Sequence, residues 1–416
     1  MMDCGVIAMS NRSRTSIIII GVVIFLLDLS VIGRAQARVD NPGRALAKNA
    51  GRVVELEEVL RIRDDGATAV FKMPRELALG PDNSLYLIDY DEGPRLYRFS
   101  PEGKLVSKLL KRGQGPGEVQ NPSGFLVTND RIRVLSWIPP KIMDFNLDGR
   151  FLRESRVMED THGLWFLAVA DGRIYGIRDE VLRSAAFGSE GVFSIPNRVY
   201  EISPDFRSWT KLYEFPVRMM IKRRNAFRLD PIDADIQGST LYILHTAEYQ
   251  AVEFDLQAGK VKRVISRAYD RVRASSKKPA EPDPETRGVD LPDDPYVWDI
   301  DRIHAAAGKL WVFTSVMKPN GDDQRVDVFD REGRFVDSVI LRFPAGGRNH
   351  RGVARWTVLT DDGFFIIPEQ EENGLISIGK YRIPDPGLFP AQITPKRNPA
   401  ANRRPNHENR AGVWPM

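Results

Sequence analysis

Two residue types that often build functional sites are scarce in this chain of 416 residues, which has one cysteine and five histidines. The cysteine, Cys4, lies before an N-terminal apolar run, and we expect it to be absent from the mature protein. A mature chain of that kind has neither a disulfide nor a catalytic thiol. The histidines give no local metal signature, because no two of them have the short spacing of a zinc site.

Recognisable catalytic motifs are also missing. The sequence has no G-x-S-x-G element and no arrangement that suggests a serine triad. Acidic residues are plentiful, but no feature selects a pair of carboxylates for acid–base chemistry. The residues alone therefore name no catalytic group.

Charge of one sign does not dominate the sequence. The net charge is +4, with 28% charged residues. The basic residues are scattered, and no basic stretch is interleaved with aromatic residues as a nucleic-acid groove would be. We therefore expect no nucleic-acid partner.

The longest apolar run, at residues 17–27, is interrupted by Asp28 and is too short to cross a bilayer comfortably. Arg12 and Arg14 precede it, and Ala35-Gln36-Ala37 supplies small residues for cleavage. We expect residues 1–37 to be a cleaved export signal, which predicts a periplasmic or secreted protein without a membrane contact. The alternative is a retained membrane anchor.

What the sequence does contain is a repeat. Residues 95–111 read as a β-hairpin with a turn at Gly103, and its first half recurs at Lys141 and Arg325 and more weakly at Arg198 and Gln250. Four strands in about forty residues are typical of a propeller blade. An apolar second strand recurs six times, at residues 85–89, 132–136, 174–178, 241–245, 310–314 and 364–368. The expected fold is all-β, a six-bladed β-propeller.

The last repeat lacks one strand, and residues 54–62 form an isolated strand pattern that can supply it. We therefore expect the propeller to span residues 53–385 and to be closed by this N-terminal strand. Residues 38–52 read as a flexible lead-in, 271–294 as an inserted Pro-rich loop and 386–416 as a disordered, basic, Pro-rich tail. These polar segments are interpreted as solvated linkers, with partner docking as the alternative.

The run Gly113-Gln-Gly-Pro-Gly-Glu118, residues 82–89 and the turns at Gly103, Gly149 and Gly333 resemble bacterial six-bladed β-propeller proteins related to NHL repeats. The resemblance implies the fold and export. The wider group includes binding modules as well as lyases and lactonases, so it does not decide the function. The run itself is expected to be a crossing loop between blades, because no Lys-Ser/Thr follows it as in a phosphate-binding loop. The sequence departs from a regular repeat at Phe206 and Gly259.

A propeller brings loops of every blade to the mouth of its central channel, where a site is built from residues far apart in sequence. By register we expect a ligand to contact Arg75, Glu76, Asn121, Asp299 and Arg351, and a divalent metal, if one is used, to be held by His162, His245 and His350. The alternative is that these are solvated loop residues.

Two functions are compatible with this sequence. The first is a monomeric, exported, non-catalytic module that binds or scaffolds a protein, peptide, glycan or small molecule. The alternative is a metal-assisted lyase or lactonase-type hydrolase acting at the channel mouth, where a metal would polarise a carbonyl or activate water.

Overall fold

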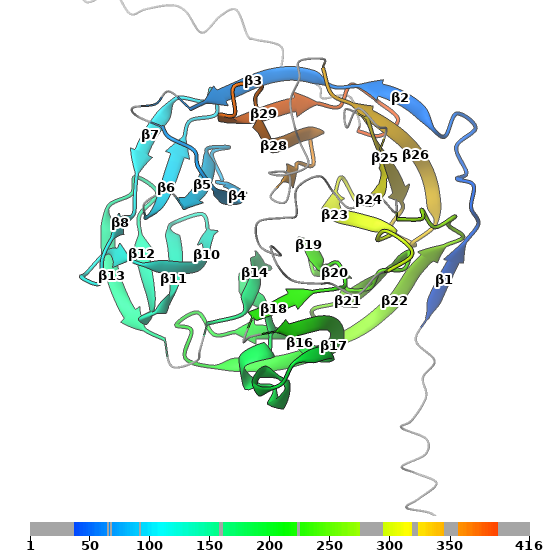
Figure 1. Ribbon diagram of the computed structural model, residues 1–416. Coiled ribbons are helices and arrows are strands. Elements are labelled where there is room, and N and C mark those ends of the chain that lie inside the picture. Colours follow the sequence, from blue (N-terminus) through cyan, green and yellow to red (C-terminus); the bar gives the residue numbers. More distant parts are fainter. Residues whose placement is uncertain are drawn as a thin grey trace, which may run out of the picture.

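The computed structural model describes residues 37–64, 66, 69–90, 93–157, 161–222, 225–274, 294–317, 323–344 and 357–389. Six sheets of four or five strands stand around a common centre (Figure 1). The predicted all-β, six-bladed arrangement is therefore confirmed. Within the described residues, no helix is long and apolar enough to cross a membrane.

The first two blades follow the hairpin repeat directly. Blade 1 consists of β4 (Pro74–Leu79), β5 (Leu85–Tyr90), β6 (Pro94–Phe99) and β7 (Leu105–Lys108). Blade 2 consists of β10 (Asn121–Val127), β11 (Ile132–Ile138), β12 (Pro140–Phe145) and β13 (Phe151–Arg156). The connection between them holds the short parallel pair β8 (Lys111–Arg112) and β9 (Glu118–Val119). The glycine run lies in this connection, as predicted.

Blade 3 has a long outer hairpin and the two short 3₁₀ helices η1 (Val181–Arg183) and η2 (Ala185–Gly188). Its strands are β14 (Leu164–Ala170), β15 (Arg173–Asp179), β16 (Gly191–Ile202), β17 (Trp209–Lys222) and β18 (Asn225–Arg228). Blade 4 contains β19 (Asp233–Gln237), β20 (Thr240–Leu244), β21 (Gln250–Asp255) and β22 (Lys260–Arg267).

The last two blades complete the ring. Blade 5 contains β23 (Ile300–Ala306), β24 (Lys309–Met317), β25 (Asp323–Phe329) and β26 (Phe335–Arg342). Blade 6 contains β27 (Val358–Leu359), β28 (Phe364–Gln370) and β29 (Ile376–Arg382). Blades 4, 5 and 6 each receive one further strand from the N-terminal segment.

The core lies between neighbouring blades, and the second strand of each blade supplies much of it. These strands overlap all six predicted apolar runs. Their recurring aromatic residues are all buried, namely Tyr86, Tyr175, Tyr242, Trp311 and Phe365. Because both faces of such a strand are covered, its sequence is apolar throughout rather than alternating.

The hairpin turns explain the glycines of the repeat. Gly103, Gly149 and Gly333 have φ angles of +80°, +87° and +77°, a left-handed conformation that costs glycine little. In blade 3 Phe206 adopts φ +58° in the equivalent turn. Its ring is fully buried beside residues of blades 2 and 3, so burial offsets the unfavourable backbone conformation.

The N-terminal segment runs along the outside of three consecutive blades (Figure 1). β1 (Arg38–Asn41) pairs in parallel with β22, and β2 (Arg52–Glu55) pairs in parallel with β26. β3 (Glu57–Arg63) pairs antiparallel with β29 and is the fourth strand of blade 6. The predicted strand at residues 54–62 is thus divided between two blades, and whether the ring depends on it for closure stays a prediction.

Residues 38–52 differ from the expected flexible lead-in because β1 pairs with blade 4 and Asn41 is buried against the propeller. The Asn41 amide donates to the carbonyls of Ser266 (3.0 Å) and Gly333 (2.9 Å) and accepts from the N–H of Phe335 (2.8 Å). A buried amide with three such bonds fixes the segment across the junction of blades 4 and 5.

The first residues of the segment expected to be a tail, 386–389, are described and in part packed on the propeller. Leu388 and Phe389 are buried, and the Phe389 ring stacks on Trp311 with 4.8 Å between centroids. The remaining tail residues 390–416, the export signal at residues 1–36 and most of the inserted loop, residues 275–293, lie outside the described residues.

Candidate functional site

The six innermost strands, β4, β10, β14, β19, β23 and β27, surround the centre of the ring (Figure 1). Because each blade repeats the same order of antiparallel strands, these strands all begin at the same end of the ring, here called the top end. The residues predicted to bind a ligand or metal were chosen for positions at this end.

Glu76 lies on β4, and its carboxyl group accepts a hydrogen bond from the backbone N–H of Phe125 on β10. Burial raises the pKa of Glu76 to about 8, so this group is largely protonated at neutral pH. Asn121 is half-buried at the start of β10, and Arg75 lies beside Glu76 on β4. Arg351 and His350 lie outside the described residues.

The same kind of contact recurs between blades 4 and 5. Asp233 and Asp235 of β19 accept hydrogen bonds from the N–H groups of Ile303 (2.7 Å) and Ala305 (2.9 Å) on β23. Burial raises the pKa of Asp233 to about 6. Each carboxyl group satisfies an N–H on the inner edge of the next blade, where no strand pairs with it. Glu76 therefore belongs to a set of contacts that join neighbouring blades.

The described histidines lie in separate places. His162 meets Trp137 edge to face at 4.7 Å, whereas His245 packs on Phe215 at 4.9 Å, and burial lowers the pKa of His245. His304 approaches Asp235 with Nδ1 at 3.4 Å and Thr357 with Nε2 at 2.7 Å. Among the described residues, no group of three or more His, Cys, Asp or Glu side chains is placed to hold a metal ion.

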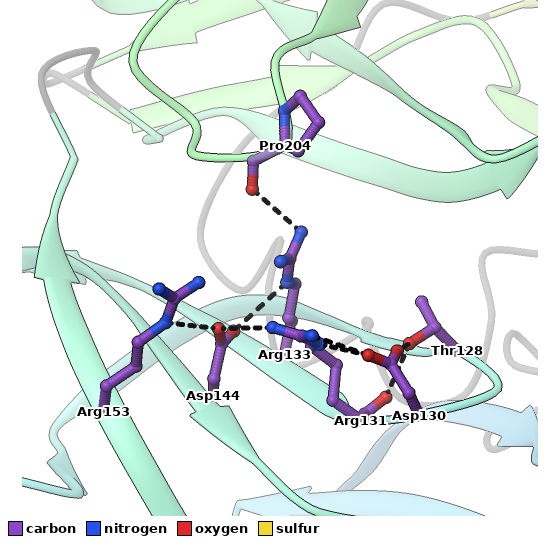
Figure 2. A network of polar contacts seen from close by, with 7 residues as sticks. All are labelled: Thr128, Asp130, Arg131, Arg133, Asp144, Arg153 and Pro204. Carbon is purple, nitrogen blue, oxygen red and sulfur yellow. Dashed lines mark hydrogen bonds and ion pairs between the residues drawn. The ribbon is translucent and has the colours of Figure 1, made fainter.

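A cluster of charged residues at the opposite end joins blades 2 and 3 (Figure 2). The buried Asp144 carboxylate accepts from Nε of Arg133 (3.1 Å) and Nε of Arg153 (3.0 Å), and Arg131 lies 3.4 Å away. Arg133 also donates to the carbonyl of Pro204 in blade 3 (2.9 Å). Asp144 is buried beneath these guanidinium groups, so this cluster is interpreted as a structural contact.

A cavity of about 440 Å³ opens at the top end, between β1, blade 4 and the start of blade 5. This volume lies within the range of roughly 300–1,000 Å³ that is typical of small-molecule sites. Asp299 is the predicted site residue that lines it. The cavity is formed by Arg38, Asp40, Asn41, Glu248, Tyr249, Ser266, Arg267, Ala268, Tyr269, Arg271 and Asp299.

A buried arginine holds one side of the cavity in place. The Arg267 side chain is 7% exposed, and its Nε donates to Oδ2 of the fully buried Asp327 (2.8 Å). Its guanidinium group lies 4.6 Å from the ring centre of Tyr249 and 4.8 Å from that of Tyr269. The Tyr249 hydroxyl donates to the same Asp327 oxygen (2.7 Å), and burial keeps the pKa of Tyr249 well above its usual value. These contacts hold the two tyrosine rings and the Arg267–Asp327 ion pair in fixed positions on one side of the cavity.

The rim carries both signs of charge. Arg271 donates through Nε to Oδ1 of Asp299 (3.0 Å) and lies 4.7 Å from the ring centre of Tyr296. Arg38 donates through Nε to Oδ1 of Asp40 (2.6 Å). Glu248 is exposed at the rim and interacts electrostatically with Arg38.

Residues 79–173 match the model of a family described as a 6-bladed beta-propeller. This match agrees with the six sheets of the structure. The chain is a six-bladed β-propeller. No curated protein matches the propeller in sequence.

Solved structures similar to this propeller have very different sequences. A candidate exported protein from Bacteroides fragilis is 14% identical, with a TM-score of 0.49 over 84% of this chain and 99% of that one. A calcium-binding protein, regucalcin, from Agrobacterium tumefaciens is 10% identical, with a TM-score of 0.41 over 80% and 97%. A luciferin-regenerating enzyme is also 10% identical, with a TM-score of 0.41 over 79% and 94%. At these identities the similarity concerns the fold alone.

Most residues of the cavity were not identified from the sequence. Arg38, Asp40 and Asn41 lie in the segment interpreted as a lead-in. Arg267 ends an ordinary strand pattern, and Arg271 begins the segment interpreted as an inserted loop. One feature of the sequence could have indicated the site. Two arginines and a tyrosine occur within residues 267–271, where the inserted loop begins.

Proposed function

We propose that this propeller is an exported binding protein that holds a small polar ligand in the cavity beside β1. The observation that carries the proposal is the cavity itself, which has a volume of about 440 Å³ and charged groups that converge on it. Small-molecule sites combine a concave surface with a few placed polar groups. Export is supported by the order of basic, apolar and small residues in the first 37 positions.

The paired side chains around the cavity support binding because they are already held in place. Arg267 is fixed by Asp327 and two tyrosine rings, and Arg271 is fixed by Asp299 and Tyr296. A ligand that meets such groups loses little free energy to the ordering of side chains. The raised pKa values of Glu76 and Asp233 need no catalytic explanation, since burial accounts for them and the N–H groups of the next blade act in the opposite direction.

The experiment is a thermal-shift assay of the mature protein with five compounds of different charge. Glucose is neutral, glucuronate anionic, spermidine cationic, dialanine zwitterionic and adenosine monophosphate a phosphate ester. A compound present at about 100 times its Kd stabilises the fold by about 2.7 kcal/mol, which is measurable.

Two double variants locate the binding. R271Q/D299N removes the ion pair at the cavity without changing net charge, and R131Q/D130N removes a similar pair from blade 2. We expect at least one compound to raise Tm in the parent and the blade 2 variant but not in the cavity variant. A shift that survives in the cavity variant, or no shift with any compound, would contradict the proposal. Stoichiometric metal in the purified protein, found by elemental analysis, would favour the alternative hydrolase or lyase.

A further inference from the structure

The charged groups around the cavity limit the chemical class of the ligand more than the volume of the cavity does. Three guanidinium groups, those of Arg38, Arg267 and Arg271, line the cavity together with the carboxylates of Asp40, Glu248 and Asp299. Arg267 is paired with the buried Asp327, so Arg38 and Arg271 remain to meet a ligand. An anion would be repelled by the three carboxylates, and a cation would be repelled by the guanidinium groups. Like charges brought together across an interface cost free energy and reject the wrong partner.

We propose that the ligand is a zwitterion of amino-acid to dipeptide size, whose carboxylate meets Arg271 and whose ammonium group meets Glu248. This proposal rests on the proposed function, because it names the ligand class of the same cavity. A dipeptide also suits a cavity of about 440 Å³, which is too small for a folded partner.

Arg271 is the guanidinium group best placed for the carboxylate. Its Nε is bonded to Asp299, and its Nη2 donates to the carbonyl of Ala247 (3.4 Å). These bonds and the Tyr296 ring fix the plane of the guanidinium group. A planar guanidinium group with a fixed orientation is suited to a carboxylate, with which it forms short, charge-assisted hydrogen bonds.

Glu248 is the carboxylate best placed for the ammonium group. Asp40 already accepts from Arg38 and Ser266, and Asp299 accepts from Arg271. The Glu248 side chain is exposed on the loop between β20 and β21, and it has no ion pair within the described part of the chain. Its electrostatic interaction with Arg38 is not a direct ion pair, so an ammonium ligand would supply a close partner for this carboxylate.

The experiment is isothermal titration of the mature protein with dialanine, N-acetyl-dialanine and dialanine amide. We expect dialanine to bind and each capped form to bind about 10- to 100-fold more weakly, since a hydrogen bond to a charged group contributes about 1.5–3 kcal/mol. E248Q should weaken dialanine by the same factor and leave N-acetyl-dialanine unchanged. E372Q, which alters an exposed glutamate in the corresponding loop of blade 6, should change neither affinity.

Equal binding of the free and capped forms, or an equal loss with E248Q and E372Q, would overturn the assignment. If dialanine does not bind but another compound of the assay above does, and R271Q/D299N abolishes that binding, the zwitterion is wrong and the binding function stands. If no compound of that assay binds, both are wrong.

Discussion

Nε of Arg271 donates to Oδ1 of Asp299 over 3.0 Å, and this contact joins the end of blade 4 to the start of blade 5. Arg271 follows β22, the last strand of blade 4 in sequence, and Asp299 directly precedes β23. Burial raises the pKa of Asp299, although the ion pair with Arg271 acts in the opposite direction. The pair thus forms one side of the cavity and connects two blades.

Glu76 is expected to make stability depend on pH. Its pKa is raised by burial from 4.5 in a model compound to about 8 in the folded protein. The folded state therefore holds the proton that the unfolded state releases, and stability falls as pH rises from about 4.5 to about 8. E76Q keeps an acceptor for the Phe125 N–H but cannot ionise. At pH 9 it should be more stable than the parent by on the order of a few kcal/mol, and at pH 5 nearly equal.

Urea unfolding at pH 5 and pH 9 measures this difference. E372Q is the control, because Glu372 is exposed. A gain for E76Q that is the same at both pH values would show that ionisation of Glu76 is not responsible.

Removal of residues 38–63 is expected to open the ring between blades 1 and 6. The segment buries Val54, Leu56 and Ile62, each of which contributes about 1.5–3 kcal/mol. That gross loss approaches the typical net stability of a domain, about 5–15 kcal/mol. Thermal unfolding and light scattering should show a lower Tm and association through the exposed edge of β29. A truncated monomer with the parent's Tm would rule out this role.

A pair of point variants in β3 tests the same strand without a deletion. Ile62 is buried opposite Ile378 of β29, whereas Val59 is 42% exposed. I62A should destabilise the protein by about 2–5 kcal/mol, and V59A by at most about 0.5 kcal/mol. If both variants lower the free energy of unfolding equally, burial of Ile62 against β29 is not what stabilises this strand.

Phe389 is expected to be part of the core rather than of a free tail. Its ring stacks on the fully buried Trp311, and F389A should cost about 3–5 kcal/mol. Leu375 is 42% exposed, so L375A serves as the control and should cost little. Urea unfolding of both variants gives the comparison. If F389A unfolds at the parent's urea concentration, the aromatic stack does not persist in solution.

Cleavage after Ala37 is expected to leave Arg38 as the first residue of the mature protein. β1 begins at Arg38, so this product keeps the strand that lines the cavity. Intact-mass analysis of the exported protein gives the N-terminus directly. A protein that retains residues 1–37 in the membrane fraction would instead support an anchor.

The six blades could be predicted because their second strands are covered on both faces and therefore apolar over several residues. β1 was not predicted and β2 was merged with β3 into one strand, since each has four residues and pairs with a distant strand. Asn41 and Ser266, which meet through a hydrogen bond, are 225 residues apart. A short strand that is held mainly by such distant contacts has few features in its own sequence from which it could be predicted.

The site was predicted only in part for a related reason. Register placed Glu76 and Asp299 at the top end, but it could not show whether a carboxyl group faces a ligand or a neighbouring backbone N–H. Glu76 bonds to Phe125, whereas Asp299 lines the cavity with Arg271. Paired charges such as Arg267 and Asp327 look in sequence like ordinary solvated residues, and their partners become known only from the fold.

The most direct test of the binding function is a crystal structure of the mature protein with the compound that raises its Tm most. The account predicts ligand density in the cavity beside β1, in contact with Arg271 and Tyr249. Density in the central channel beside Glu76 and Asp233, with an empty cavity, would contradict it.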